Sequence, residues 1–219
     1  MKIFDPKLVQ FEPETLNLFD EIKTVTEVLE KRRPFSSEVN DRLATEFLPD
    51  RITASLNMEG ISVSRRQTLL MMDAMTLSEN SSKAEVEVYN ALKADELVYE
   101  FAKEQHPLTA IIVREINGQL QENILKTAGQ YRQKDVEITG ASFQPPSFSE
   151  VEPLIREMVT TFNDPFTEYP VFWAAWLHAT FTRIHPFEDG NGRTGRLLQD
   201  YALLSSGLYP TGIPSARRD

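Results

Sequence analysis

Apolar residues recur every three or four positions along most of this chain, the spacing that places them on one face of an α-helix. The segments with this pattern are predicted to be helical, and they are 14–32, 65–77, 84–103, 109–124, 147–163, 167–184 and a stretch beginning near Asn191. Residues 128–146 differ, because their apolar residues are separated by polar ones between Gly129 and Pro145-Pro146. That pattern is typical of a short β-hairpin, so the expected fold is mainly α with one small hairpin.

A further helix is expected ahead of Gly60. Ser36 or Ser37 can cap its start, because a serine side chain accepts hydrogen bonds from the first turn of a helix. Pro49 lacks a backbone N–H and is expected to interrupt the helix. The helix then resumes over residues 51–59 and ends at Gly60, a residue type that favours the left-handed conformation after a helix.

A dozen consecutive residues between the last two predicted helices combine a base, a carboxylate, two cations and three glycines. They are His185-Pro186-Phe187-Glu188-Asp189-Gly190-Asn191-Gly192-Arg193-Thr194-Gly195-Arg196. Glycines let backbone N–H groups approach an anion closely, and the N-terminus of the following helix adds the positive end of its dipole. The stretch is therefore expected to be a loop that leads into a helix and binds an anion.

The side chains of this stretch fit phosphate chemistry. Arg193 and Arg196 are three positions apart, so on a helix they share a face and could clamp phosphate oxygens. Asp189 is a hard oxygen ligand, suited to Mg²⁺ held jointly with phosphates. His185 has an ordinary pKa near ~6.5, which suits a general base at neutral pH. Together they indicate a phosphate-handling site that deprotonates a nucleophile; the alternative is a polar turn with solvated arginines and a structural histidine.

Composition narrows the classes of partner. The net charge of −10 argues against nucleic acid as a main partner, because binding to its phosphates needs clustered cations; a single nucleotide in a locally basic pocket is not excluded. The absence of cysteine excludes thiolate catalysis, cysteine zinc sites and disulfides, and it fits the cytoplasm as the expected location. No apolar run reaches transmembrane length, so no membrane partner is expected.

The dozen residues match the signature of the Fic family, H-P-F-x-[D/E]-G-N-G-R-x-x-R, at every defined position. The chain resembles Fic proteins over roughly residues 50–219, with residues 1–49 as an N-terminal helical extension. The resemblance implies a Fic-like helical bundle that transfers AMP from ATP to a serine, threonine or tyrosine hydroxyl of a target protein, with Mg²⁺ as cofactor. Fic proteins usually continue with further helices, so the resemblance also implies a chain that is truncated at its C-terminus or is a short gene product.

The resemblance assigns roles to several residues of the signature, and by it Phe187 would anchor the loop in the core. His185 would deprotonate the target hydroxyl, and Asp189 would bind Mg²⁺. Arg193 and Arg196 would hold the phosphates of ATP. The residues that would form the anion-binding nest are Gly190, Asn191 and Gly192.

A second string, Ser55-Leu56-Asn57-Met58-Glu59-Gly60, matches the Fic motif [S/T]-x-x-x-E-[G/N]. In the class II type of Fic protein this motif marks an inhibitory helix, here about residues 50–60, whose glutamate pairs with the second arginine of the signature. The resemblance therefore implies autoinhibition by Ser55 and Glu59 acting on Arg196; the alternative is a plain helix end. In some relatives this glutamate also helps to remove AMP from the modified target.

The predicted hairpin matches the flap with which Fic proteins hold the backbone of their target. Its expected docking residues are Ile138, Thr139 and Gly140, and a surface hairpin without this role is the alternative. Two other functions stay open. A related transferase would move UMP, phosphate or phosphocholine, although the retained Gly190 favours a nucleotidyl donor. A non-catalytic or antitoxin-like module usually lacks the histidine or the glycines, and this chain keeps them.

Overall fold

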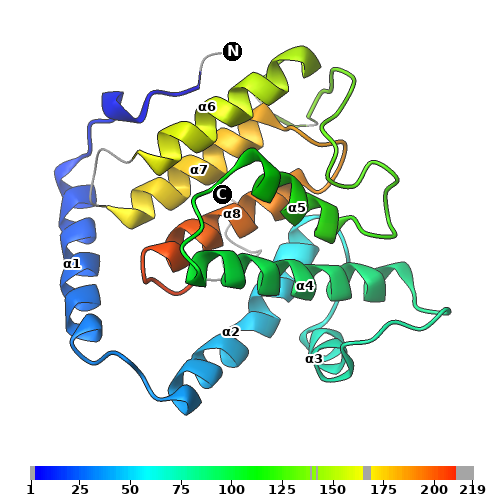
Figure 1. The fold of residues 1–219 in the computed structure, drawn as a ribbon, viewed down its shortest axis with the longest axis horizontal. Helices are drawn as coiled ribbons and strands as arrows, with labels where there is room; N and C mark the ends of the chain where they lie inside the picture. Colours follow the sequence, from blue (N-terminus) through cyan, green and yellow to red (C-terminus); the bar gives the residue numbers. More distant parts are fainter. Residues whose placement is uncertain (1–2, 139, 142, 165–168, 211–219) are drawn as a thin grey trace.

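The structure, a computed structural model, describes residues 3–138, 140–141, 143–164 and 169–210, without the side chains of residues 37, 40, 41 and 43–45. Its α-helices are α1 Pro13–Glu30, α2 Ser37–Met58, α3 Arg65–Ala74, α4 Lys83–Lys103, α5 Ala110–Leu120, α6 Val151–Asn163, α7 Pro170–Ile184 and α8 Asn191–Ser205 (Figure 1). Short 3₁₀ helices span Pro6–Leu8 and Phe148–Glu150. The predicted mainly α fold is confirmed.

Helices α7 and α8 pack against each other at the centre of the bundle, with α4, α5 and α6 around them (Figure 1). α7 is apolar on most sides, and its Trp173, Leu177 and Phe181 are buried, which suits a helix enclosed by others. α8 contacts α2, α4 and α5 as well as α7. Several helices therefore converge on α8, and each can place side chains beside it.

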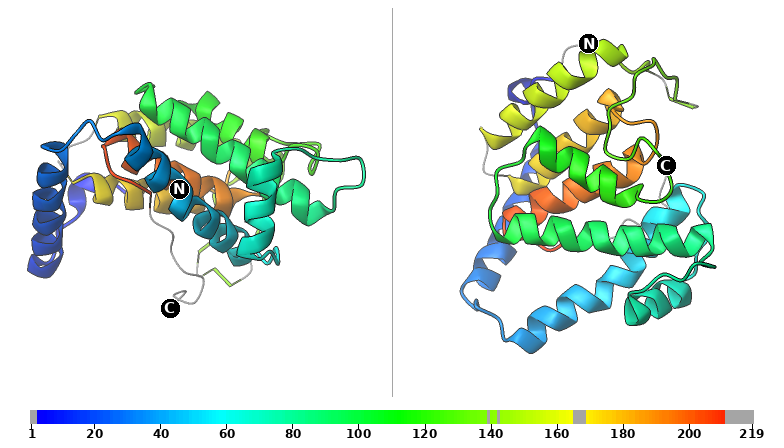
Figure 2. Two further views of the ribbon diagram at one scale, coloured as in Figure 1. Left: turned by 90° about the horizontal axis from the view of Figure 1, so that it is seen from below. Right: turned by 45° about the vertical axis from the view of Figure 1, so that its right-hand side comes forward.

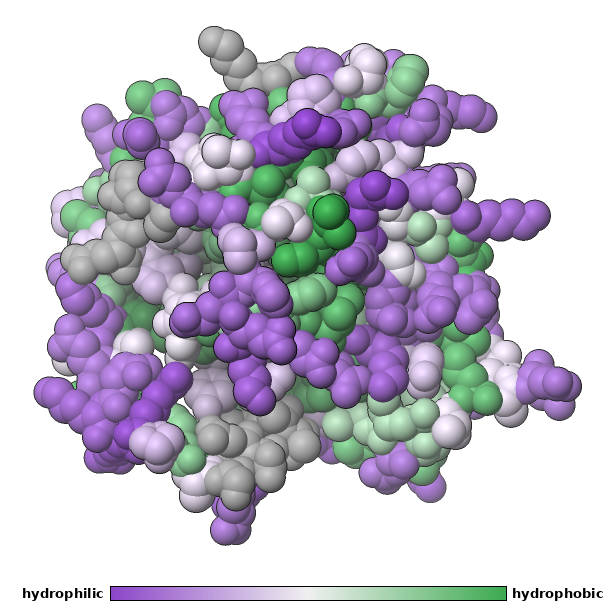
Figure 3. Space-filling view, viewed as in Figure 1, coloured by the Kyte–Doolittle hydropathy of each residue, from purple (hydrophilic) through white to green (hydrophobic). Residues whose placement is uncertain are grey.

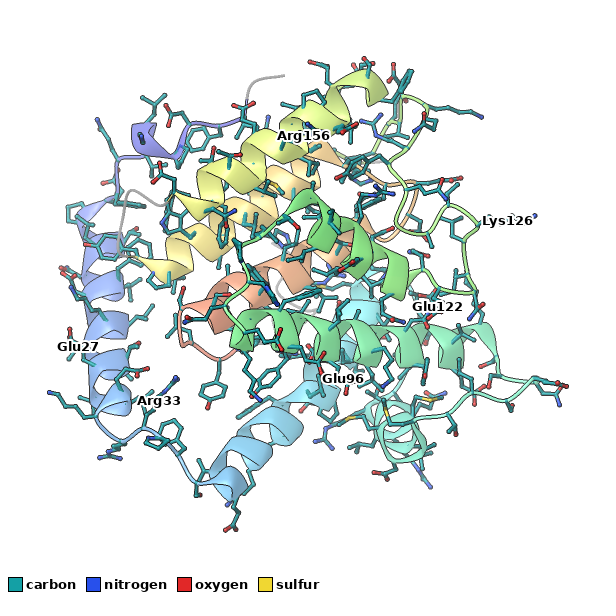
Figure 4. The ribbon with its side chains drawn as sticks, in the orientation of Figure 1. Glu27, Arg33, Glu96, Glu122, Lys126 and Arg156 are labelled. Atoms are coloured by element: carbon teal, nitrogen blue, oxygen red, sulfur yellow. The ribbon has the colours of Figure 1, made fainter. Side chains whose placement is uncertain are left out.

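Charged side chains cover the outside of the bundle. Glu27 of α1, Lys126 of the loop after α5 and Arg156 of α6 point away from the helices (Figure 4). Hydrophilic residues predominate on the face seen in Figure 3, as expected for side chains that would lose their hydration if buried. Among the described residues, no helix has both the length and the apolar character needed to cross a membrane.

α1 and the first half of α2 lie at the edge of the molecule (Figures 1 and 2). α1 has no buried residue, and Phe47 in the first half of α2 is exposed. The second half of α2 differs, because Ile52 and Leu56 are buried in the core. α2 therefore connects an exposed arm to the centre of the bundle as one continuous helix.

The prediction that Pro49 interrupts this helix is wrong, since α2 runs from Ser37 to Met58 with Pro49 inside it. A proline removes one backbone hydrogen bond and crowds the preceding turn. Pro49 is itself buried, and the turn after it packs in the core through Ile52. Tertiary packing therefore outweighs the local preference of the chain.

The predicted hairpin over residues 128–146 is also wrong for the described part of that segment. Its β-type pairing consists of one antiparallel bridge, which joins Tyr131 to Phe187 of the signature. The side-chain Nε of Arg132 donates to the backbone oxygen of His185 at 2.9 Å. The described part of the segment thus pairs with the signature loop instead of forming a hairpin of its own, a pairing that the spacing of its apolar residues does not reveal.

Candidate active site

The signature forms the turn between α7 and α8, as predicted. His185 directly follows α7 with φ 51° and ψ 59°, a left-handed conformation that is uncommon for residues with a side chain and often found at functional sites. Gly190 caps the start of α8 with φ 79°. The Asn191 side chain closes the loop, because it accepts from the N–H of Phe187 and donates to the oxygen of the same residue, each at 2.9 Å.

Phe187 anchors this loop in the core. It is 1% exposed, and its ring lies against the rings of Phe181 and Tyr131, with centroids 6.1 and 5.5 Å away. The loop is therefore held both by its own hydrogen bonds and by a buried aromatic side chain. A loop fixed in this way can present backbone N–H groups in a constant geometry.

The start of α8 is the candidate anion site. The first N–H groups of a helix have no acceptor within the helix, and they carry the positive end of its dipole. The carboxylate of Glu59 lies directly against this turn: a Cβ atom added to Gly192 would come within 2.3 Å of Glu59 Oε1. Only glycine leaves room for a carboxylate so close to the backbone. Glu59 therefore occupies space beside the turn that a phosphate group would approach.

Glu59 and Arg196 form an ion pair across the site. Arg196 Nη2 donates to Glu59 Oε1 at 2.7 Å, and the two side chains are 19% and 33% exposed. The same guanidinium donates through Nε to the side-chain Oγ of Ser55 at 2.8 Å and through Nη2 to the backbone oxygen of Ser55 at 3.0 Å. The end of α2 thus holds Arg196 by three hydrogen bonds. The structure brings together the residues that the second motif singled out, and their inhibitory role remains a prediction.

Arg193 has a different environment. Its side chain is 4% exposed and its Nη1 pairs with the equally buried carboxylate of Glu87 from α4. Its Nη2 lies 3.5 Å from Asp189 Oδ2. The guanidinium therefore neutralises a buried acid and faces the loop from inside. Its predicted contact with phosphate stays a prediction, and the role of Glu87 as its partner was not predicted from the sequence.

Asp189 faces solvent at the mouth of the site. Its side chain is 58% exposed, and its Oδ1 accepts from the N–H of Gly190 at 2.6 Å. The described residues include no group of three or more histidine, aspartate and glutamate side chains that could enclose a metal. Mg²⁺ is often held by one or two carboxylates together with the phosphates of a substrate, and Asp189 beside the anion site fits that mode.

His185 is poised to be neutral near pH 7. Burial lowers the pKa of its imidazole below the ordinary value, and the nearby Arg132 guanidinium lowers it further; hydrogen bonding to Thr182 and the carboxylates of Glu59 and Asp189 act in the opposite direction. Its Nδ1 lies 3.4 Å from the Thr182 oxygen. A carbonyl oxygen can only accept, so that contact places the proton on Nδ1 and leaves Nε2 free to take one.

Two amide side chains, from Asn117 of α5 and from Gln121 directly after it, support the loop, and neither was predicted from the sequence. The Asn117 side chain donates to the backbone oxygen of Asp189 at 3.0 Å and to Thr194 Oγ1 at 3.3 Å. Gln121, with its amide oriented to satisfy its neighbours, accepts from the N–H of Gly190 at 3.2 Å and from Arg193 Nη2 at 2.9 Å. Both side chains are almost wholly buried. Polar amides beside the apolar face of the predicted helix 109–124 were the signal that could have revealed them.

The flap residues lie as follows. Ile138 is half-buried, Gly140 is exposed with φ 82°, and Thr139 lies outside the described residues. The preceding residues run beside the signature loop through the pairing of Tyr131 with Phe187. A role for this segment in binding a target remains a prediction.

A buried charged cluster lies behind Arg196. Arg51 of α2 donates from Nη2 to Asp95 of α4, and its Nη1 is 3.5 Å from Asp200 Oδ2 of α8. Burial raises the pKa of Asp200 to about 7. The nearby Arg51 guanidinium lowers this pKa, and the neighbouring Asp95 raises it. Burial likewise raises the pKa of Asp95. None of these residues was predicted from the sequence to belong to the site.

Asp200 is expected to make the protein less stable as the pH rises. The unfolded chain releases this proton near 3.8, whereas the folded protein keeps it up to about 7, so the free energy of unfolding falls between these values. Asp200→Asn should remove about 2 kcal/mol of the decrease between pH 5 and 7.5. Urea unfolding at both pH values measures this. An equal pH dependence in parent and variant would show that Asp200 titrates normally.

Comparisons with known proteins agree with this geometry. Residues 107–203 match the model of the Fic/DOC family. A probable protein adenylyltransferase of Aquifex aeolicus is 42% identical over 78 residues, which is 36% of this chain and 24% of that protein. The protein adenylyltransferase Fic of Drosophila willistoni is 35% identical over 92 residues, 41% of this chain and 18% of that protein. The match spans about a quarter or less of the length of these relatives.

Solved structures share the fold. The crystal structure of a Fic-domain-containing signaling protein from Bacteroides thetaiotaomicron superposes with a TM-score of 0.79 at 28% identity, covering 90% of this chain and 77% of that one. This likeness extends over most of the described helices, beyond the segment matched by the family model. Residues 107–203 therefore match the Fic/DOC family, and the chain shares the fold of a solved Fic-domain structure.

Proposed function

We propose that this protein is a protein adenylyltransferase that moves AMP from ATP to a hydroxyl of a target protein. The observation that carries the proposal is the joint placement of His185, Asp189 and Arg196 around the N-terminus of α8. Both curated relatives above are named adenylyltransferases. The proposal takes residues 50–219 as the transferase unit, residues 1–49 as a helical extension and the cytoplasm as the place of action.

The geometry suggests how the residues of the chain divide the work. Nε2 of neutral His185 takes the proton of the target hydroxyl, whose oxygen attacks the α-phosphorus while pyrophosphate leaves in line. The N–H groups of Gly192 and its neighbours bind phosphate oxygens as charge builds on them. Arg196, once released from Glu59, holds the outer phosphates. The chain supplies no covalent nucleophile in this scheme, so its main contribution is position and charge.

Asp189 is the residue that would hold Mg²⁺, and the metal would supply positive charge to the phosphate groups. We expect Asp189→Ala to lower transfer strongly and to abolish its response to added Mg²⁺, because a carboxylate beside bound phosphate is otherwise repulsive. The measurement is a Mg²⁺ titration of self-labelling, done in a Glu59→Gly background. Glu188→Ala is the matched control, since this neighbouring carboxylate is held by the Thr127 hydroxyl at 2.7 Å. If parent and Asp189→Ala show the same activation curve, Asp189 is not the ligand.

The proposal includes regulation and a site for the target. Glu59 would inhibit transfer by occupying Arg196 and the space beside Gly192, and it would also help water remove AMP from the modified target. A target backbone would lie along the segment that contains Ile138 and Gly140, which follows the bridge between Tyr131 and Phe187.

Labelled nucleotides test the function against its rivals. The Glu59→Gly variant is incubated with Mg²⁺ and labelled ATP, and transfer to itself or to lysate proteins is measured. Labelling by ATP above the level with UTP or a phosphocholine donor supports adenylylation. Preference for another donor would identify a related transferase. No labelling with any donor would leave the alternative of a non-catalytic or antitoxin-like module.

A further inference from the structure

Arg196 is held from one side by Ser55 of α2 and by Glu59, the residue directly after this helix. Arg51 and Ser55 are four residues apart and so lie on the same side of α2, and Glu59 follows four residues later, directly after the helix. Ser55 and Glu59 both accept from Arg196. Arg51 is the first of the three, directly after Asp50, and its side chain is 12% exposed. It stands where α2 passes from the exposed arm into the core.

Arg51 is held by two other helices. It pairs with Asp95 of α4 and with Asp200 of α8, whose side chains are 16% and 14% exposed. Asp200 lies one helical turn beyond Arg196. Arg51, Asp95, Asp200, Ser55 and Arg196 all line one cavity of about 50 Å³. The cluster therefore abuts the guanidinium that Glu59 holds.

We propose that Arg51, Asp95 and Asp200 form a latch that fixes the end of α2 on α8 and α4 and so keeps Glu59 in the anion site. Apolar contacts through Ile52 and Leu56 tolerate small shifts of the helix, whereas a shift that separates Arg51 from Asp95 and Asp200 leaves a buried charge without its partners and is strongly penalised. Arg51 is in this view a positioning residue that acts through Glu59. The inference rests on the proposed inhibition of transfer by Glu59.

Opening the latch would release Glu59. α2 is a continuous helix from Ser37 to Met58, so a displacement of its exposed first half reaches Arg51 before it reaches Glu59. Once Arg51 leaves Asp95 and Asp200, this end of α2 is still bonded to Arg196 through Ser55 and Glu59. ATP phosphates can then compete for Arg196 with a carboxylate that is no longer fixed in place.

Self-labelling with labelled ATP and Mg²⁺ tests the latch through its dependence on Glu59. Arg51→Met should raise labelling about tenfold, which corresponds to a moderate shift toward the released state. The double variant Arg51→Met with Glu59→Gly should label no faster than Glu59→Gly alone. Arg65→Met is the matched control, because Arg65 also pairs with α2, through Asp50 at 2.8 Å, but on an exposed surface; it should change nothing.

A folded Arg51→Met protein that labels at the parental rate would overturn the latch. So would an increase of the same factor in the Glu59→Gly background, since the effect would then not pass through Glu59. If Arg51→Met does not fold, Arg51→Lys replaces it, because lysine keeps the charge but cannot span both Asp95 and Asp200 as a planar fork does.

Hydrogen exchange separates failure of the latch from failure of the proposed function. Amides of residues 52–59 should exchange faster in the Arg51 variant than in the parent or in Arg65→Met, with or without ATP. If Glu59→Gly labels nothing with any nucleotide while this exchange difference is present, the proposed function fails and the latch stands as a structural device. Unchanged exchange at residues 52–59 would overturn the latch whatever the activity.

Discussion

His185→Ala is expected to lower AMP transfer by about 10² to 10⁴, the usual contribution of a general base, while ATP binding changes little. In the proposed scheme the phosphate contacts would come from the start of α8 and from Arg196, which do not depend on the imidazole. Transfer is measured as single-turnover labelling in a Glu59→Gly background, and binding as the dissociation constant of ATP. Labelling by His185→Ala at the parental rate would contradict the assignment of the base.

The pH profile gives a second test of the same residue. Burial lowers the pKa of His185 below its ordinary value of 6.5, so the base form persists in weakly acidic solution. Transfer should therefore decline only as the pH falls below about 6.5 and the imidazole gains a proton. His106→Ala is the control, because this exposed imidazole is bonded to Glu104 and lies away from the site. It should leave both rate and profile unchanged.

The helices were predictable because their apolar spacing matches the faces that the fold buries. The predicted segment 84–103 corresponds to α4, Lys83–Lys103, whose inward face includes Val88, Leu92 and Val98. The predicted segment 109–124 ends earlier, at Leu120. There the side-chain amide of Asn90 donates to the backbone oxygens of Leu120 and Glu122. This long-range contact is not encoded in the spacing of apolar residues.

The residues of the candidate site likewise fall into those that could be predicted from the sequence and those that could not. The geometry around His185, Asp189 and Gly190 follows from a contiguous string, so the local sequence was enough to place these residues at one turn. The contact of Glu59 with Arg196 joins residues far apart in the chain, and it was expected because a second string matched a family motif. Asn117 and Gln121 had no such motif, and their burial against the loop depends on how α5 packs on α8.

The largest misreading concerned residues 128–146. Alternating apolar and polar residues can satisfy a hairpin, but they can also serve an irregular segment that docks on its neighbours. Gly129 shows which applies: with φ 68°, its missing Cβ would lie 2.8 Å from the Arg114 oxygen. Its N–H bonds to Asn117 at 3.1 Å. The backbone of Gly129 and Tyr131 is therefore paired with residues outside the segment, and not across a hairpin.

Glu59→Gly is expected to raise transfer by at least about tenfold, because small errors in the position of reacting groups cost large factors in rate. In the parent, Arg196 donates to Glu59 at 2.7 Å, and the carboxylate lies against Gly192, where it would repel phosphate. One guanidinium cannot hold both groups in the same geometry. Removing the side chain frees Arg196 for the outer phosphates of ATP and clears the turn of α8.

The stability of the variant should change little, by less than about 1 kcal/mol, since the lost pair is partly exposed. Labelling of the variant and the parent with labelled ATP is the first measurement, and Glu59→Gln is the matched control. Glutamine still accepts a hydrogen bond from Arg196 but carries no charge, so its labelling should fall between the two. Equal labelling by the parent and Glu59→Gly would remove the inhibitory role. If labelling rises while removal of AMP from a modified target is unchanged, Glu59 inhibits transfer. The same result would show that Glu59 takes no part in the removal of AMP.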